Sequence, residues 1–188
     1  MEFKEIQVSE MNFNPFDKIS KQWMLVTAGD EESSNTMTAS WGGVGIMWGK
    51  PVATVYIRPQ RYTKEFVDKN EYFTLSFLPE EYRRALNVCG SVSGRNVEDK
   101  WQEAGLHPVK IDGTTAVEEA EEVFVCRKLY AQEMVPECFI DRECDTKWYP
   151  DKDYHTMYIA EIVKVLKIYN ADRADIIFSE LKETEYED

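Results

Sequence analysis

Histidine is scarce in this sequence and its cysteines are widely spaced, which argues against a metal site. Only His107 and His155 could supply imidazole ligands. The chain has four cysteines, Cys89, Cys126, Cys138 and Cys144. None of them belongs to a C-x-x-C pair, and in a chain of 188 residues they do not amount to a disulfide framework. We therefore predict no metal site, and free thiols in a reducing cytoplasm.

Long hydrophobic runs and basic residues are also in short supply. The opening stretch, MEFKEIQVSEM, is not apolar enough for a signal peptide or a membrane anchor, so we expect neither and predict a cytoplasmic protein. Acidic residues number 35 against 22 basic ones, and the formal net charge is -13. Non-specific nucleic-acid binding and docking on anionic membranes both need a cationic surface, so both classes are disfavoured.

The common nucleotide-binding signatures are missing too, because the chain contains neither G-x-G-x-x-G nor a Walker loop. It does contain enough apolar material for a core, since 43% of its residues are hydrophobic. No internal repeat or linker interrupts it. We predict a single domain spanning residues 1–188.

Strand signals recur at short spacing along the chain. Tyr72–Leu78 alternates large apolar with smaller or polar side chains, the period of two that indicates a strand. Val52–Ile57 is rich in β-branched residues and is flanked by Pro51 and Pro59. Further strands are expected at Gln22–Ala28, Thr36–Trp41, Val44–Trp48, Glu122–Met134 and His155–Tyr169.

Helix signals are fewer and shorter. Thr63 is expected to cap a short helix, a second helix should cover residues 80–88 and end near Cys89-Gly90, and a third should run from Val97 to Ala104. The aperiodic, acidic segment 135–153 is interpreted as an excursion or lid, and the acidic C-terminal tail is expected to fray. The pattern predicts a mainly β fold with short helices, an antiparallel, Greek-key-like barrel rather than a doubly wound sheet.

Polar side chains and arginines gather in the stretch NTMTASWGGVGIMWGKPVATVYIRPQR. Its first strand offers hydroxyl and amide groups that could bond the edge of a planar cofactor, at Asn35, Thr36, Thr38 and Ser40. Arg58, Arg61 and Thr63 stand before a short helix, where a phosphate could be held. Flavin mononucleotide (FMN) has both of these ends.

A purely structural interpretation of the same residues stays open on the pattern alone. NTMTASW could be an edge strand with a solvated hydroxyl face, and RPQR could be a surface turn. Trp41 and Trp48 are more often core residues than cofactor-stacking ones.

A family resemblance favours the cofactor. The chain resembles the flavin reductase-like family, and within it the flavoredoxin-type proteins of anaerobic bacteria and archaea. The blocks that carry the likeness are NTMTASWGGVGIMWGKPVATVYIRPQRYTKEF, YFTLSF, CGSVSGRNVEDKWQEAGL, CRKLYAQ and YPDKDYHTMYIAEIVKV. The resemblance implies an FMN-binding split barrel, usually a homodimer with the cofactor near the subunit interface.

The resemblance also implies roles for matching positions. The segment beside the flavin ring corresponds to Asn35, Thr36, Met37, Thr38, Ala39, Ser40 and Trp41. The ribityl-phosphate loop corresponds to Arg58, Arg61, Tyr62 and Thr63, and the adjacent strand to Ser76 and Phe77. A loop that closes over the cofactor corresponds to Cys89 through Lys100, including Ser93. His155 matches a histidine that often lies near the site.

Two departures from the family pattern stand out. The stretch after Ser93-Gly94-Arg95 is one residue longer than usual before Lys100, and Ala160 replaces a glycine. For Cys89 and for His155, the sequence leaves two interpretations open. Cys89 is either a redox thiol beside the flavin or a small residue that ends a helix. His155 is either a proton donor or a structural histidine.

These observations predict an FMN-binding redox flavoprotein. It would be an oxidoreductase that passes electrons from NAD(P)H through FMN to a flavin or small acceptor, or a flavoredoxin-like electron carrier with a protein redox partner and no NAD(P)H site. A flavin-binding module without turnover is a third alternative. The absence of a nicotinamide signature does not separate the first two.

Overall fold

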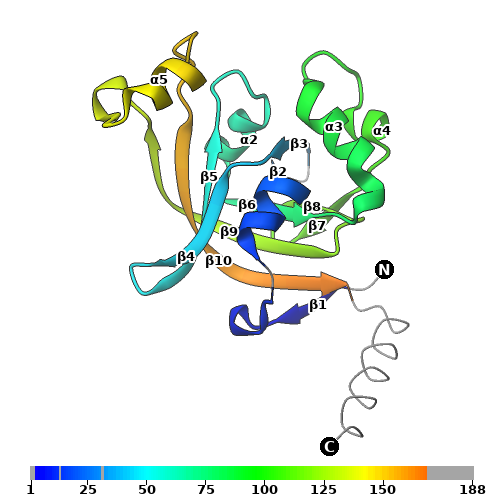
Figure 1. Ribbon diagram of the computed structural model, residues 1–188. Helices are drawn as coiled ribbons and strands as arrows, with labels where there is room; N and C mark the ends of the chain where they lie inside the picture. The colour runs from blue at the N-terminus through cyan, green and yellow to red at the C-terminus, as the bar shows by residue number, and fades with distance from the viewer. Residues whose placement is uncertain (1–2, 13, 31, 169–188) are drawn as a thin grey trace, which may run out of the picture.

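A computed structural model describes residues 3–12, 14–30 and 32–168, and its body is an eight-stranded sheet (Figure 1). The strands are β1 (Phe3–Ile6), β2 (Met24–Gly29), β3 (Ser34–Ala39), β4 (Gly42–Met47), β5 (Lys50–Ile57), β6 (Tyr72–Phe77), β9 (Glu122–Glu133) and β10 (Thr156–Ile168). Their order is β3-β2-β6-β9-β10-β5-β4, with β1 beside β10, and every pairing is antiparallel. A separate hairpin pairs β7 (Pro108–Ile111) with β8 (Thr114–Val117).

The helices are short and stand mostly at one end of the sheet (Figure 1). They are α1 (Pro15–Asp17), α2 (Thr63–Lys69), α3 (Arg83–Ser91), α4 (Lys100–Ala104) and α5 (Arg142–Trp148). Single turns of other helix types occur at Val8–Glu10, Lys18–Gln22, Glu80–Tyr82 and Pro136–Cys138. No helix among the described residues is long and apolar enough to cross a membrane.

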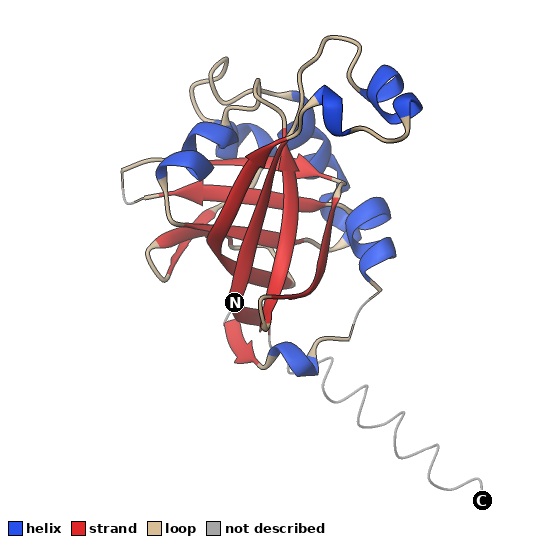
Figure 2. Ribbon diagram, turned by 90° about the vertical axis from the view of Figure 1, so that its left-hand side faces the viewer, coloured by secondary structure: helices blue, strands red, loops and turns tan. Residues whose placement is uncertain are grey.

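The sheet curls around one apolar core, with one set of strands crossing the other (Figure 2). Buried residues from both ends of the strand order meet in this core, among them Met37 of β3, Val55 of β5 and Tyr158 of β10. The pairing of β10 with β9 shifts register between Ile159 and Ala160, and irregularities of this kind let a long strand bend. The sheet is therefore an open barrel rather than a flat layer.

A second core lies between the sheet and the elements that cover its outer face. Leu25 of β2 and Val123 of β9 pack there with Leu86 of α3 and Ala116 of β8. The outward-facing Thr74 of β6 donates to the Thr115 carbonyl at 2.7 Å, so this polar face is buried as well. Both faces of β6 are therefore buried. For this reason large apolar residues alternate with smaller polar residues along the strand, and buried residues do not alternate with exposed ones.

The predicted β-rich class and all seven predicted strands are confirmed, with shifts of a few residues at their ends. β4 begins at Gly42, so the two glycines belong to a strand rather than separating two. Residue 169, the predicted end of the last strand, and the predicted frayed tail lie outside the described residues. Strand β1 and the β7–β8 hairpin were not predicted.

Two details of the helix predictions are wrong, the role of Thr63 and the start of α4. Thr63 is not a cap, because it is the first helical residue and its hydroxyl accepts from Asn35 Nδ2 at 2.7 Å. The predicted end of the second helix near Cys89-Gly90 is confirmed to within one residue, since α3 ends at Ser91. Helix α4 begins only at Lys100, because Asp99 accepts from the amides of residues 101 and 102 and so caps it. The predicted end of this helix at Ala104 is confirmed, and Gly105 follows it with a left-handed backbone, φ 66°.

Candidate functional site

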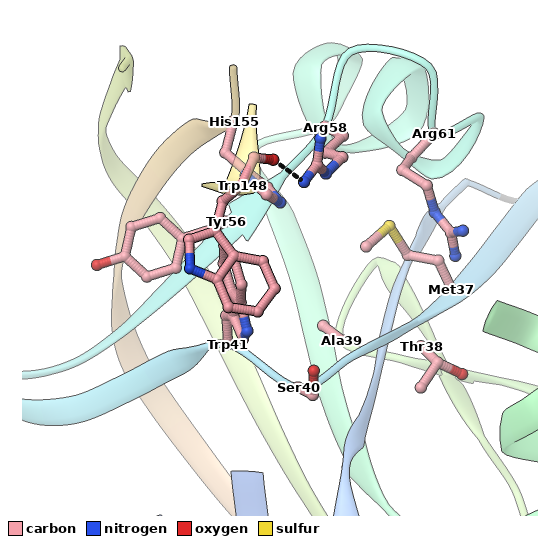
Figure 3. A pocket seen from close by; sticks show the side chains of 10 residues that line it. All are labelled: Met37, Thr38, Ala39, Ser40, Trp41, Tyr56, Arg58, Arg61, Trp148 and His155. Carbon is pink, nitrogen blue, oxygen red and sulfur yellow. Dashed lines mark hydrogen bonds between the residues drawn. The ribbon is translucent and has the colours of Figure 1, made fainter. Parts of the chain in front are cut away.

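A cavity of about 330 Å³ opens where β3 passes into β4 (Figure 3). It is lined by Met37, Thr38, Ala39, Ser40, Trp41, Tyr56, Arg58, Arg61, Trp148 and His155. Eight of these ten come from the residues singled out in the sequence, and Tyr56 and Trp148 are additions. The fold therefore brings the polar strand, both arginines and the histidine to one place.

The position of the cavity follows from the topology of the sheet. β3 and β4 are the two ends of the strand order, yet only Ser40 and Trp41 separate them in the chain. No strand among the described residues pairs with the outer edge of β3. An unpaired strand edge presents main-chain donors and acceptors. One of them, the Thr36 carbonyl, accepts from Lys100 Nζ at 2.7 Å.

One end of the cavity is cationic, and its cations meet the C-terminal end of α3. Arg61 donates from Nη1 to the Gly90 carbonyl at 2.5 Å and from Nη2 to the Cys89 carbonyl at 3.1 Å. Lys100 Nζ also donates to the Cys89 carbonyl, at 3.1 Å. The hydroxyl of Thr38 donates to the Leu86 carbonyl. Arg61 and Lys100 thus satisfy two carbonyls, those of Cys89 and Gly90, that the end of the helix leaves unpaired.

The electrostatics of this end are unusual because Lys100 is buried and Arg61 is half-buried. Burial, reinforced by the nearby Arg61 guanidinium, lowers the pKa of Lys100 to about 8. Burial also lowers the pKa of Arg61. Within the described ranges neither cation has a carboxylate partner. Buried cations without a counter-ion are costly, so this end is suited to an anionic group.

The thiol of Cys89 takes no direct part in the cavity. Its side chain is fully buried in the second core, where burial raises the pKa of the thiol to about 11. A protonated, enclosed thiol is a poor nucleophile. These facts favour the structural interpretation of Cys89, with its carbonyl rather than its sulfur in the polar contacts.

The other end of the cavity is aromatic (Figure 3). The rings of Trp41 and Trp148 meet edge to face, with centroids 5.1 Å apart. The imidazole of His155 lies 5.2 Å from the ring of Trp41, and its Nδ1 is 2.8 Å from the hydroxyl of Tyr149. Burial, reinforced by the charge of Arg58, lowers the pKa of His155 to about 4. His155 is therefore a neutral imidazole at neutral pH.

Arg58 links strand β5 to the segment 135–153. It donates from Nη2 to the Trp148 carbonyl at 2.8 Å, shown as the dashed line in Figure 3, and forms an ion pair with Asp153. Its guanidinium also lies over the ring of Tyr149, 5.1 Å from the centroid. These contacts use much of its donor capacity, so Arg58 is an anchor for this segment as well as a lining residue.

The remaining predicted site residues lie behind or beside the cavity rather than lining it: Asn35, Thr36, Tyr62, Thr63, Ser76, Phe77, Cys89, Ser93 and Lys100. Asn35 and Thr63 are buried, and their side chains are hydrogen-bonded to each other. Ser76 and Phe77 are also buried, and both lie in strand β6. Ser93 accepts from the Arg95 amide at 3.3 Å within the loop between α3 and α4.

That loop is held against the 58–63 turn. The guanidinium of Arg95 lies 4.7 Å from the ring centroid of Tyr62 and donates to the Gln60 carbonyl at 3.1 Å. Gly94 approaches so closely that a Cβ there would clash with Asn35 Oδ1 and lie 3.1 Å from Tyr62 Cδ1. A glycine is required at this position because no side chain fits.

Comparison with known proteins gives a consistent result. Residues 16–181 match the family model described as the flavin reductase like domain. An FMN-binding domain of a flavin reductase-like enzyme from Shewanella baltica is similar, with a TM-score of 0.63 and 14% identity over 90% of this chain and 81% of that one. Flavoredoxin of Desulfovibrio vulgaris gives 0.60 and 26%, over 79% and 70%.

A third solved structure, an NADH:FAD oxidoreductase from Streptomyces globisporus, gives a TM-score of 0.58 and 16% identity, over 78% of this chain and 75% of that one. A comparison with curated proteins finds no match. The structural neighbours confirm the predicted split-barrel fold.

Proposed function

Because the chain belongs to the flavin reductase-like family, we propose that it is an FMN-binding redox flavoprotein whose cofactor occupies the cavity beside β3. The observation that carries the proposal is the pair Arg61 and Lys100. Arg61, which is half-buried, lines one end of a cavity whose wall is a free strand edge, and the buried Lys100 lies behind it. Neither cation has a carboxylate partner among the described residues. A phosphate would supply the missing charge.

The lining residues fit the two ends of this cofactor. Arg61 would hold the phosphate, with Lys100 behind it, while the main chain of β3 and the hydroxyl of Ser40 would bond the polar edge of the ring. Bound FMN would supply the redox chemistry, and the protein would supply position and electrostatics. The other predicted residues would act by fixing these groups, as Asn35 does through its bond to Thr63.

His155 is suited to be a hydrogen-bond donor at the aromatic end of the cavity. If the Tyr149 hydroxyl donates to Nδ1, the neutral imidazole carries its hydrogen on Nε2. The neighbouring charge of Arg58 opposes protonation of the ring, which keeps it in this neutral form. His155 would then donate a hydrogen bond without adding a positive charge to the cavity.

We favour an oxidoreductase that takes electrons from NAD(P)H and passes them to a flavin or small acceptor, because the cavity leaves an aromatic end beside the groups assigned to FMN. The alternative is an electron carrier with a protein partner. It is supported by the similarity to flavoredoxin, the neighbour of 26% identity.

The test has two stages. The purified protein should bind FMN at about one per chain, and failure to bind at micromolar concentration would refute the proposal. The loaded protein is then mixed anaerobically with NADH, NADPH or reduced ferredoxin while bleaching of the visible flavin band is followed. Rapid bleaching by a nicotinamide supports the reductase. Bleaching by ferredoxin alone supports the carrier.

We also propose that the domain, residues 1–188, forms a homodimer. Edge strand β4 and its turn expose the apolar side chains of Ile46, Met47 and Trp48, with exposed fractions of 77%, 40% and 57%. Size exclusion with light scattering should give twice the chain mass. Ile46→Asp should yield monomers, whereas Phe16→Asp, at an equally exposed apolar position outside the sheet, should not. A wild-type protein that binds FMN as a monomer would refute the dimer.

A further inference from the structure

The aromatic end of the cavity is built from parts of the chain that are far apart. Trp41 follows β3, Tyr56 belongs to β5, and Trp148 ends α5. The two tryptophans keep 37% and 44% of their surface exposed although they stand in a cavity. Large apolar rings left partly bare inside a concave site commonly mark a place where a ligand packs.

The wall that carries Trp148 is preformed. Tyr149 and Tyr154 of the same segment have ring centroids 4.9 Å apart, and both pack against Phe139. The Tyr154 hydroxyl donates to Asp145 at 2.9 Å, which ties the end of the segment to α5. Together with the bond from Arg58 to the Trp148 carbonyl, these contacts fix the main chain at Trp148, and the indole itself packs against Trp41. Such preorganisation lowers the entropy that binding costs.

Charge limits what this end can accept. The guanidinium of Arg58 lies near the imidazole of His155, and Arg61 stands at the far side of the cavity. Asp153 offsets the charge of Arg58, but Arg61 has no carboxylate partner among the described residues and would repel a cationic ligand, despite the attraction of ring faces for cations. A flat, neutral or anionic ring could pack against the indoles and accept a hydrogen bond from His155.

We propose that Trp148, held by Arg58 against Trp41, forms a second subsite in the cavity that selects planar, non-cationic small molecules as the redox substrate of the flavoprotein. This inference rests on the proposed function, because it places the second substrate beside bound FMN. Trp148 is a specificity-determining residue in this account, and Arg58 is a positioning residue that acts through it.

The experiment uses two uncharged probes of similar size that share a carboxamide but differ in ring shape. Benzamide is planar and cyclohexanecarboxamide is puckered. Each is titrated into the full-length protein saturated with FMN, and the shift of the visible flavin band gives Kd. We expect benzamide to bind about 5- to 10-fold more tightly than cyclohexanecarboxamide, as an aromatic ring contact should provide.

Substitutions of Trp148 then test whether this residue causes the preference for the planar probe. Trp148→Ala should weaken benzamide binding about 5- to 10-fold and remove the preference for the planar probe, whereas Trp148→Phe should keep much of both. The matched control is Phe16→Ala, which removes an exposed aromatic ring from α1, outside both the cavity and the proposed dimer surface. It should leave the Kd of both probes as in the wild-type protein.

Three results would overturn the inference. Equal binding of both probes to the wild-type protein would remove the planar preference. Tighter benzamide binding to Trp148→Ala would mean that the indole blocks the space rather than forming its wall. A Trp148→Ala variant that loses FMN affinity but binds benzamide normally would assign the indole to the flavin ring instead. Failure of the wild-type protein to bind FMN at all would refute the proposed function, and it would be seen before any probe is added.

Discussion

Arg61 and Lys100 donate to one and the same main-chain oxygen, the carbonyl of Cys89, each at 3.1 Å. This shared acceptor draws two like charges together at the C-terminal end of α3, where the helix dipole is negative. The carbonyls offset only part of the repulsion between the two cations, because they carry partial charges. A phosphate dianion would offset more of it.

Arg61→Ala should weaken FMN binding strongly and riboflavin binding little. Riboflavin has the same ring and ribityl chain without the phosphate, so it reports any damage to the rest of the site. Loss of a charge-assisted bond of about 1.5–3 kcal/mol corresponds to roughly 10- to 150-fold in Kd for FMN. Fluorescence quenching of the two flavins measures both constants.

Arg84→Ala is the matched control, since Arg84 is an exposed arginine on α3 that does not line the cavity. It should change neither constant. Ser40→Ala, at the ring end, should weaken both flavins about equally. If Arg61→Ala weakened the binding of FMN and of riboflavin by the same factor, the role of Arg61 would be structural, through its bonds to α3, and it would not bind the phosphate.

The affinity ratio of FMN to riboflavin should fall as pH rises from 7 to 9. Lys100, whose pKa is lowered to about 8, is protonated at pH 7 and attracts the phosphate, but it is largely neutral at pH 9. The loss would reach at most about 10-fold, since one proton is released per chain over that interval. Using the ratio cancels the ionisation of the ring. In Lys100→Met the ratio should be nearly independent of pH, and an unchanged slope there would exclude Lys100.

Acid should destabilise the fold through His155. In the unfolded chain this imidazole takes up a proton near its ordinary pKa of 6.5, whereas in the fold it does so only at about 4. The unfolded state therefore binds more protons between these values, and stability falls as pH falls through them. The free energy of unfolding in urea should drop by at most about 2 kcal/mol between pH 7 and pH 5 on this account. His155→Gln should remove that part of the drop.

The other histidine provides a control of opposite sign. His107 lies on the surface beside Glu119, with Nδ1 2.6 Å from Oε1, and the hydrogen bond raises the pKa of His107. Its stabilisation is present at low pH and is lost as pH rises through its folded pKa. His107→Gln should therefore steepen the loss of stability in acid. The assignment of the acid effect to His155 fails if both variants change the pH profile in the same direction.

Gly94→Ala should destabilise the protein by about 1–3 kcal/mol, the usual cost of forcing an extra methyl into a packed site. The new Cβ would push against Asn35 Oδ1 and the ring of Tyr62, and so displace the loop between α3 and α4. Thermal unfolding measures the effect. Gly43→Ala is the control, because no heavy atom lies within 4 Å of a Cβ at Gly43. Equal melting temperatures for the two variants would contradict the close contact.

Local patterns in the sequence predicted the strands well because burial and backbone preference agree there. Phe73, Leu75 and Phe77 alternate, and all three pack into the barrel core as a period of two requires. The unpredicted β7–β8 hairpin also carried a local signal. Asp112-Gly113 is a favoured two-residue hairpin turn, and both residues have the positive φ of such a turn, 48° and 76°.

Other parts of the site had no local signal. Arg58 reaches the Trp148 carbonyl across 90 residues of sequence, so neither the anchor nor the aromatic wall could be predicted from spacing. Thr63 was predicted as a cap because threonine favours that position, but a tertiary bond from Asn35 competes for its hydroxyl. The composition of the cavity was predicted better than the bonds inside it, because those bonds depend on how distant segments meet.

The two-residue connection between β3 and β4 has a consequence for folding. These strands are neighbours in sequence but stand at opposite ends of the sheet. The wall formed by Met37 and Thr38 of β3 and the wall that includes Tyr56 of β5 are therefore both in place only after every strand between β3 and β5 has paired. A partly assembled barrel has no cavity, and a ligand of the cavity can bind only the completed one. Bound flavin should therefore slow global unfolding, and recovery of flavin binding during refolding should lag behind recovery of β structure.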